Sequence, residues 1–148
     1  MWRRLPMSVL AAMLAALPAY GAARYNCAAD DANVKLSIDV AFADKGARNL
    51  SHFRGALIAK PSGVPAGFAQ LMLDSSQLVH SWAYGDELRL DIYGEGQDAE
   101  AGSSFDLIVI AGRDAPNAPL PGTYLLTYGG QKNAAAPQLK GTLTCFAK

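Results

Sequence analysis

The histidines and serines of this 148-residue sequence are the first candidates for catalysis, and their spacing forms no catalytic pattern. The two histidines are His52 and His80, and His80 is followed by Ser81. Neighbouring residues of a strand point to opposite faces, so His80 and Ser81 cannot act as a base and its nucleophile. A GxSxG turn, which would present a serine nucleophile, is absent from the sequence. We therefore expect no catalytic residue and a protein that is not an enzyme.

Metal-ligating residues are not clustered either. The acidic clusters in predicted loops are Asp30 with Asp31, and Asp98 with Glu100. Neither has the spacing of a calcium loop, which needs several oxygen ligands and a turn glycine at fixed positions. We expect solvated loop charge, no metal site and no cofactor. Two acids brought together by the fold, as in glycosidases, stay open because nothing in the spacing tests them.

The two cysteines, Cys27 and Cys145, lie far apart in the chain. In an oxidising compartment such a pair forms a disulfide by default. A metal pair or reactive thiols is the alternative, but no CxxC spacing and no nearby histidine supports it. A disulfide requires that the first and last strands lie side by side or face each other across a core.

The N-terminus predicts export to such a compartment. Arg3 and Arg4 precede an apolar stretch, residues 5–19, which is shorter than the roughly 20 residues of a membrane-spanning helix. Small residues follow, so residues 1–23 are typical of a secretory signal peptide, cleaved after Gly21 or after Ala23. An uncleaved anchor is the alternative. We expect residues 24–148 to form a single β-rich domain in the periplasm or outside the cell, with no membrane span.

The amino-acid composition and net charge exclude several classes of protein. The chain has 13 basic and 13 acidic residues, 51 % hydrophobic residues and 18 % charged residues. These values exclude a disordered chain and a coiled coil. Loss of the arginines at positions 3 and 4 leaves a net charge of about −2 and no basic stripe, so we expect no nucleic-acid partner.

Apolar residues recur at period two and predict strands. The clearest case is Val34–Phe42, where five apolar positions alternate with others. Further strands are expected at 50–59, 77–83, 87–93, 105–111, 123–128 and 139–146, and 68–73 is either a strand or a helical turn. The segment Tyr84-Gly85-Asp86 predicts a hairpin turn. Residues 105–111 are almost continuously apolar, which predicts a central strand covered on both faces.

These patterns predict an all-β fold. We expect one antiparallel β-sandwich or small β-barrel of about 7–8 strands, stapled by the Cys27–Cys145 disulfide. Sandwich and barrel stay open, because strand pairing order is a long-range property.

Aromatic residues give the candidate binding site. Tyr84 lies in the predicted turn, and Tyr93 alternates with the apolar face near Arg89. Exposed aromatic rings beside charged groups are typical of recognition surfaces for protein or sugar. We therefore expect Trp82, Tyr84, Arg89 and Tyr93 to contact an envelope or extracellular protein, or a cell-surface polysaccharide.

Three short segments carry a family resemblance: Tyr25-Asn26-Cys27, the run Trp82–Glu87, and the late Cys145. They are loosely similar to the small periplasmic lysozyme inhibitors of bacteria, which are β-rich, disulfide-stapled and secreted. The resemblance covers less than a tenth of the chain and carries over no functional residue. It implies an alternative function, the inhibition of a secreted hydrolase such as lysozyme. A small hydrolase built from long-range contacts is the third possibility.

Overall fold

The computed structural model describes residues 23–43 and 49–148, so the expected signal segment up to residue 22 lies outside the described residues. The strands are β1 (Ala23–Asp30), β2 (Val34–Phe42), β3 (Leu50–Ala59), β4 (Gln70–Asp74), β5 (Leu78–Tyr84), β6 (Glu87–Glu95), β7 (Ser104–Gly112), β8 (Leu120–Gly129) and β9 (Leu139–Ala147). Three 3-10 helices, η1 (Ala66–Phe68), η2 (Asp98–Glu100) and η3 (Gln131–Asn133), lie in the connections.

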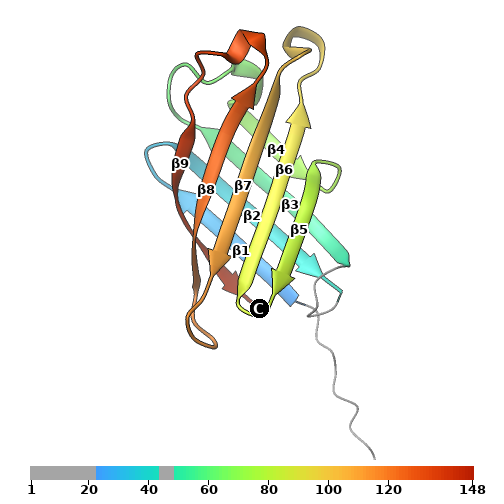
Figure 1. Cartoon of the computed structure of the whole chain (residues 1–148), viewed down its shortest axis with the longest axis vertical. Helices are drawn as coiled ribbons and strands as arrows, with labels where there is room; N and C mark the ends of the chain where they lie inside the picture. The colour runs from blue at the N-terminus through green and yellow to red at the C-terminus, as the bar shows by residue number, and fades with distance from the viewer. Residues whose placement is uncertain (1–22, 44–48) are drawn as a thin grey trace, which may run out of the picture.

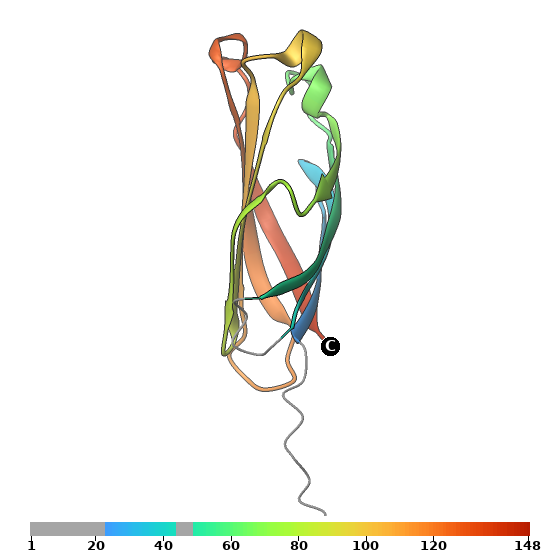
Figure 2. The ribbon, with the colours of Figure 1, turned by 90° about the vertical axis from the view of Figure 1, so that its right-hand side faces the viewer.

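All nine strands belong to one antiparallel sheet in the order β4-β3-β2-β1-β9-β8-β7-β6-β5. Because β1 pairs with β9, the two ends of the described chain close a nearly complete barrel, and β4 and β5 are its two edges. In Figure 1 strands β5–β9 lie in front of β1–β4, and Figure 2 shows these two layers from the side. The all-β prediction is confirmed, with nine strands in the described part of the chain instead of the expected 7–8.

The core fills the space between the layers. Alternate residues of β2 point inward, and Val34, Leu36, Ile38 and Val40 are all buried. The predicted alternation of β6 holds as well, since Leu88, Leu90 and Ile92 are buried. Because side chains alternate between the two faces of a strand, the polar residues of these strands lie on the outer face.

The outer face of β7 differs from its prediction. Strand β7 is central, between β6 and β8, and Leu107 and Val109 are fully buried. Ile108, however, is only partly buried and Ile110 is 41 % exposed. No described segment of this chain covers the outer face, so the expectation of a strand covered on both faces is wrong within the described residues.

The disulfide prediction is confirmed. Cys27 on β1 and Cys145 on β9 are paired directly opposite each other, with 4.0 Å between their Cα atoms. Of the two arrangements that the sequence allows, the fold uses neighbouring strands. Both side chains are buried, and the bond spans 118 residues of sequence. A buried disulfide is consistent with an oxidising compartment.

The two ends of the barrel differ. The 3-10 helices lie at the upper end in Figure 1, whereas the β5–β6 turn, the β7–β8 loop and the C-terminus lie at the lower end. Among the described residues, no helix is long and apolar enough to cross a membrane.

Candidate functional site

The β5–β6 hairpin positions most of the predicted binding residues. Its two-residue turn, Gly85-Asp86, begins with Gly85 at φ 59°, a left-handed conformation that glycine adopts at the first position of a type II′ turn. The turn sets Trp82 directly opposite Arg89 across the hairpin. Because Tyr84 is two residues after Trp82, both rings lie on the outer face.

Three of the predicted side chains form one cluster. The rings of Trp82 and Tyr84 stack with centroids 6.1 Å apart and 24° between their planes. The guanidinium carbon of Arg89 lies 5.5 Å from the centroid of the Trp82 ring, within range of a cation–π interaction. Arg89 Nε also donates to Glu87 Oε1 at 2.5 Å. Tyr84 and Arg89 thus cover part of the Trp82 side chain. Trp82 is 36 % exposed, whereas Tyr84 is 68 % exposed.

Ile110 on β7 extends this cluster, because it is paired with Arg89 across β6 and β7. A shallow hollow of about 550 Å³ adjoins the cluster and is lined by Trp82, Tyr84, Gly85, Asp86, Glu87, Ile110, Ala111, Gly112, Arg113 and Asp114. We call Trp82, Tyr84, Arg89 and Ile110, with this hollow, the β5–β7 surface. The sequence prediction missed Ile110, although the continuous apolar run of β7 contained the signal.

Tyr93 does not join the cluster. It lies four residues beyond Arg89 on β6, a separation of about 13 Å along a strand. Its ring is exposed, and its hydroxyl donates to Glu95 Oε1 at 3.3 Å.

Two carboxylates lie further along the outer face of β6 and β7, Asp91 two residues from Arg89 and Asp106 four residues from Ile110. Asp91 is paired with Ile108 and Asp106 with Tyr93, so the two acids are diagonal neighbours on the same outer face. Burial, followed by the hydrogen bond and the negative charge of Asp91, raises the pKa of Asp106. Neither acid forms an ion pair with another described residue. The sequence alone had left open whether the fold brings two acids together.

The histidines lie on outer faces. His52 Nε2 is 3.4 Å from Asp39 Oδ2, a carboxylate that also binds Arg24. His80 on β5 is paired with Asp91 on β6. In residues 23–43 and 49–148, no three His, Cys, Asp or Glu side chains are grouped closely enough to hold a metal ion.

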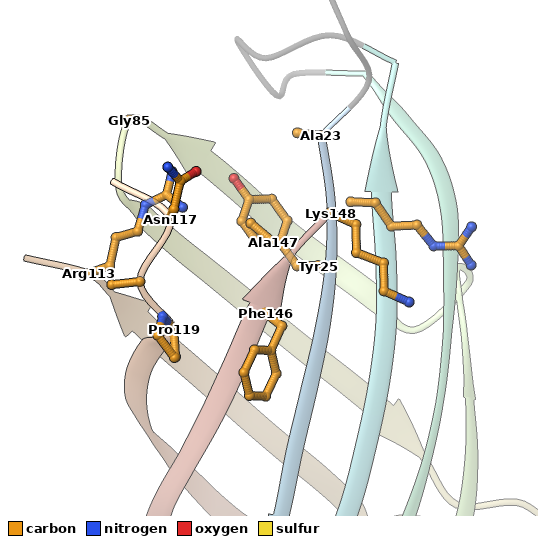
Figure 3. Close-up of a pocket in the computed structure, with 11 residues that line it drawn as sticks. Ala23, Tyr25, Gly85, Arg113, Asn117, Pro119, Phe146, Ala147 and Lys148 are labelled. Atoms are coloured by element: carbon orange, nitrogen blue, oxygen red, sulfur yellow. The ribbon is translucent and has the colours of Figure 1, made fainter. Parts of the chain in front are cut away.

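A second hollow, the end pocket, lies at the lower end of the barrel and has a volume of about 660 Å³. Figure 3 shows its wall: β1 and β9 contribute one side and the β7–β8 loop the other. The pocket is lined by Ala23, Arg24, Tyr25, Gly85, Arg113, Asn117, Ala118, Pro119, Phe146, Ala147 and Lys148. None of these residues was predicted as a site residue.

No protein-family model, no curated protein and no solved structure matches this chain. Its function is therefore inferred from the geometry of its own surfaces.

Proposed function

We propose that this chain is an exported, non-enzymatic protein of the bacterial cell envelope that binds a protein partner through the β5–β7 surface. One observation carries the proposal. Strand β7 has the composition of a strand covered on both faces, yet Ile110 is 41 % exposed and lines the same hollow as Trp82 and Tyr84. Large exposed apolar patches on monomers mark interaction sites, so a partner supplies the missing cover.

The residue types favour a protein over a polysaccharide. Trp, Tyr and Arg dominate the binding energy of protein interfaces. A sugar ring needs an accessible aromatic face, but the indole of Trp82 already contacts Tyr84 and Arg89. The aliphatic Ile110 offers a sugar neither a π face nor a hydrogen bond, whereas it packs well against apolar protein side chains.

The charged groups on and near this surface indicate what kind of partner would fit it. Arg89 is neutralised by Glu87, and Arg113 by Asp86. Among the described residues, no cation pairs with the carboxylate of Asp91 or Asp106, and the two acids lie next to Ile108 and Tyr93. A partner that presents a lysine or arginine amid apolar residues would complement both features.

The test is capture from envelope extract by the immobilised chain with its disulfide formed. The surface variant is Trp82→Ser/Ile110→Thr. The control variant, Met72→Ser/Val79→Ser, removes apolar residues that are also exposed but lie outside the β5–β7 surface. We expect one protein to be retained by the wild type and the control and lost with the surface variant. That protein, once purified, should bind the wild type at least tenfold more tightly than the surface variant.

Other outcomes would replace the proposal. Equal capture by all three chains would contradict a partner at this surface. Variant-sensitive binding to purified envelope polysaccharide, without a captured protein, would assign the surface to a sugar polymer instead. Lysozyme inhibition at micromolar protein would identify the partner as a hydrolase, and unchanged lysozyme activity would exclude that alternative. A substrate turned over by the wild type but not by His80→Ala or His52→Ala would contradict the non-enzymatic assignment.

A further inference from the structure

We propose that the outer face of β5–β8 binds a basic amphipathic helix of the partner, whose lysines or arginines lie beside Asp91 and Asp106. The inference rests on the proposed function, because it describes how a protein partner occupies the same side of the barrel. It also extends the binding site beyond the β5–β7 surface, onto β8.

An apolar band crosses this outer face diagonally. Trp82 on β5 and Ile110 on β7 lie in one row, because each is paired with Arg89 on β6. In the next row, Ile108 on β7 is paired with Leu125 on β8, and both side chains are only partly buried. Ile110 and Ile108 are two residues apart on one strand, so they point the same way and join the two rows. We call Trp82, Ile110, Ile108 and Leu125 the outer band.

A helix fits the outer band better than an added strand does. Strands β5–β8 lie side by side in one layer (Figure 1), about 4.8 Å apart, so the band spans about 14 Å and its rows are about 7 Å apart. A helix of three turns is about 16 Å long and about 10 Å wide, and its apolar stripe would cover the band. An added strand needs a free sheet edge, whereas β7 and β8 are each paired on both sides.

The charge of the face selects basic residues on that helix. The charged residues that point outward from β6 and β7 are four acids and one base: Glu87, Asp91, Glu95, Asp106 and Arg89. Among the described residues, the one acid of this set with an ion-pair partner is Glu87. The face is therefore negative, and a positively charged partner complements it.

Asp91 and Asp106 border the outer band. Asp91 is paired with Ile108, and Asp106 lies two residues before Ile108 on the same strand. Burial, followed by the hydrogen bond and the charge of Asp91, raises the pKa of Asp106. A cation placed beside the two carboxyl groups would offset their repulsion. A helix that covers Ile108 with an apolar side chain can reach both acids with a lysine or arginine of the neighbouring turn.

The test measures binding of a fluorescein-labelled helical peptide of leucine and lysine, about 14 residues long, by fluorescence anisotropy. The protein is the full chain purified from an exporting host, with its disulfide formed. We expect saturable binding of one peptide per chain. The same peptide with glutamate in place of lysine should bind at least tenfold more weakly.

Two double variants locate the peptide on the face. Asp91→Asn/Asp106→Asn and Ile108→Thr/Leu125→Thr should each weaken binding of the lysine peptide at least fivefold. The control Asp30→Asn/Asp98→Asn removes the same charge from exposed positions on β1 and η2. The control Ile58→Thr/Met72→Thr removes exposed apolar side chains from β3 and β4. Both controls should change the affinity less than twofold.

Three results would overturn the inference: equal affinity for the lysine and glutamate peptides, binding that neither face variant weakens, and absence of saturable binding. The proposed function fails separately. A captured protein that is lost with Trp82→Ser/Ile110→Thr, together with no binding of the lysine peptide, would keep the partner and overturn the basic helix. Lysine-peptide binding that both face variants weaken supports the helix site even without a captured protein, a result that would count against the proposed function alone.

Discussion

A hydrogen bond between Tyr124 and Asp31 links β8 to the β1–β2 turn, which is distant in sequence. Tyr124 Oη, on β8, donates to Asp31 Oδ2 at 2.6 Å, while Asp31 Oδ1 accepts the N–H groups of Asn33 and Val34. Burial acts to raise the pKa of Asp31, but the hydrogen bonds from Tyr124, Val34 and Asn33 outweigh it and the pKa is lowered. Gly141 makes room for this contact, because a Cβ there would lie 2.3 Å from the Asp31 carboxylate.

Tyr124→Phe removes this hydrogen bond to a carboxylate. We expect it to lower the free energy of unfolding at pH 7 by about 1–3 kcal/mol. A lowered pKa in the folded state stabilises the fold above the unfolded-state pKa of 3.8, and that stabilisation is lost as the pH falls through the folded-state value. The difference between variant and wild type should therefore shrink at pH 2–3. Urea unfolding at both pH values measures it.

Tyr93→Phe is the matched control, because its exposed hydroxyl contacts only Glu95 among the described side chains. We expect a change within about 0.5 kcal/mol. Equal losses of unfolding free energy in the two variants would show that the Tyr124–Asp31 hydrogen bond stabilises the fold no more than an exposed one.

Asp106→Asn tests the acid pair on the outer face. The raised pKa of Asp106 means that the folded state holds its proton more tightly than the unfolded state. Its ionisation therefore costs stability as the pH rises from 3.8 through the folded-state value, and this cost persists at neutral pH. We expect Asp106→Asn to raise the free energy of unfolding at pH 7 by up to about 1 kcal/mol, and to have little effect near pH 3. A destabilised variant at pH 7 would contradict repulsion between the two acids.

At the scale of the element, the inner face of β7 packs in the core, and its outer face belongs to the proposed binding surface. Leu107 is fully buried, so Leu107→Ala should cost about 2–5 kcal/mol of stability. Ile110→Thr changes an exposed side chain and keeps a β-branched residue, so its stability should stay within about 0.5 kcal/mol of the wild type. Thermal unfolding compares the two. A large loss in Ile110→Thr would mean that Ile110 belongs to the core.

Local patterns were enough to predict most strands. Val34–Phe42 and Glu87–Tyr93 alternate large apolar and polar residues, and both form strands. Strand β1 was not counted, because its inward positions after Tyr25 are the small Cys27 and Ala29. The segment 68–73 left strand and helical turn open, and the fold contains both: η1 ends at Phe68 and β4 begins at Gln70.

The candidate site was predicted only where its residues are local in sequence. Trp82, Tyr84 and Arg89 meet because one short turn joins their strands. Asp91 and Asp106 meet because β6 pairs with β7 in one register, which no local pattern specifies. The end pocket is still less accessible to prediction, since it needs β1, β9 and the β7–β8 loop together.

At the scale of the whole molecule, the disulfide closes the barrel where the chain ends meet. It joins strands 118 residues apart in sequence, on a β1–β9 contact of only four residue pairs. Replacement of both cysteines by alanine should lower the free energy of unfolding by about 4–5 kcal/mol in the chain-entropy description. The reduced wild type should match the variant in urea unfolding. A loss below 1 kcal/mol would show that β1 and β9 stay paired without the bond.

Both hollows lie at the lower end of the barrel and share Gly85 and Arg113 in their walls. Arg113, which pairs with Asp86, therefore lines both hollows, whereas Asp86 lines only that of the β5–β7 surface. Substitutions in the two regions can be compared directly, because Phe146 lines only the end pocket and Ile110 only the β5–β7 surface.

Photo-cross-linking in an exporting bacterial host tests the binding surface most directly. A benzophenone amino acid replaces Ile110 in one chain and Met72, also exposed but on β4, in another. We predict a discrete cross-linked protein from position 110 that is absent from position 72 and is lost when Trp82→Ser is added. No adduct from position 110, or the same adduct from both positions, would contradict a protein partner at the β5–β7 surface.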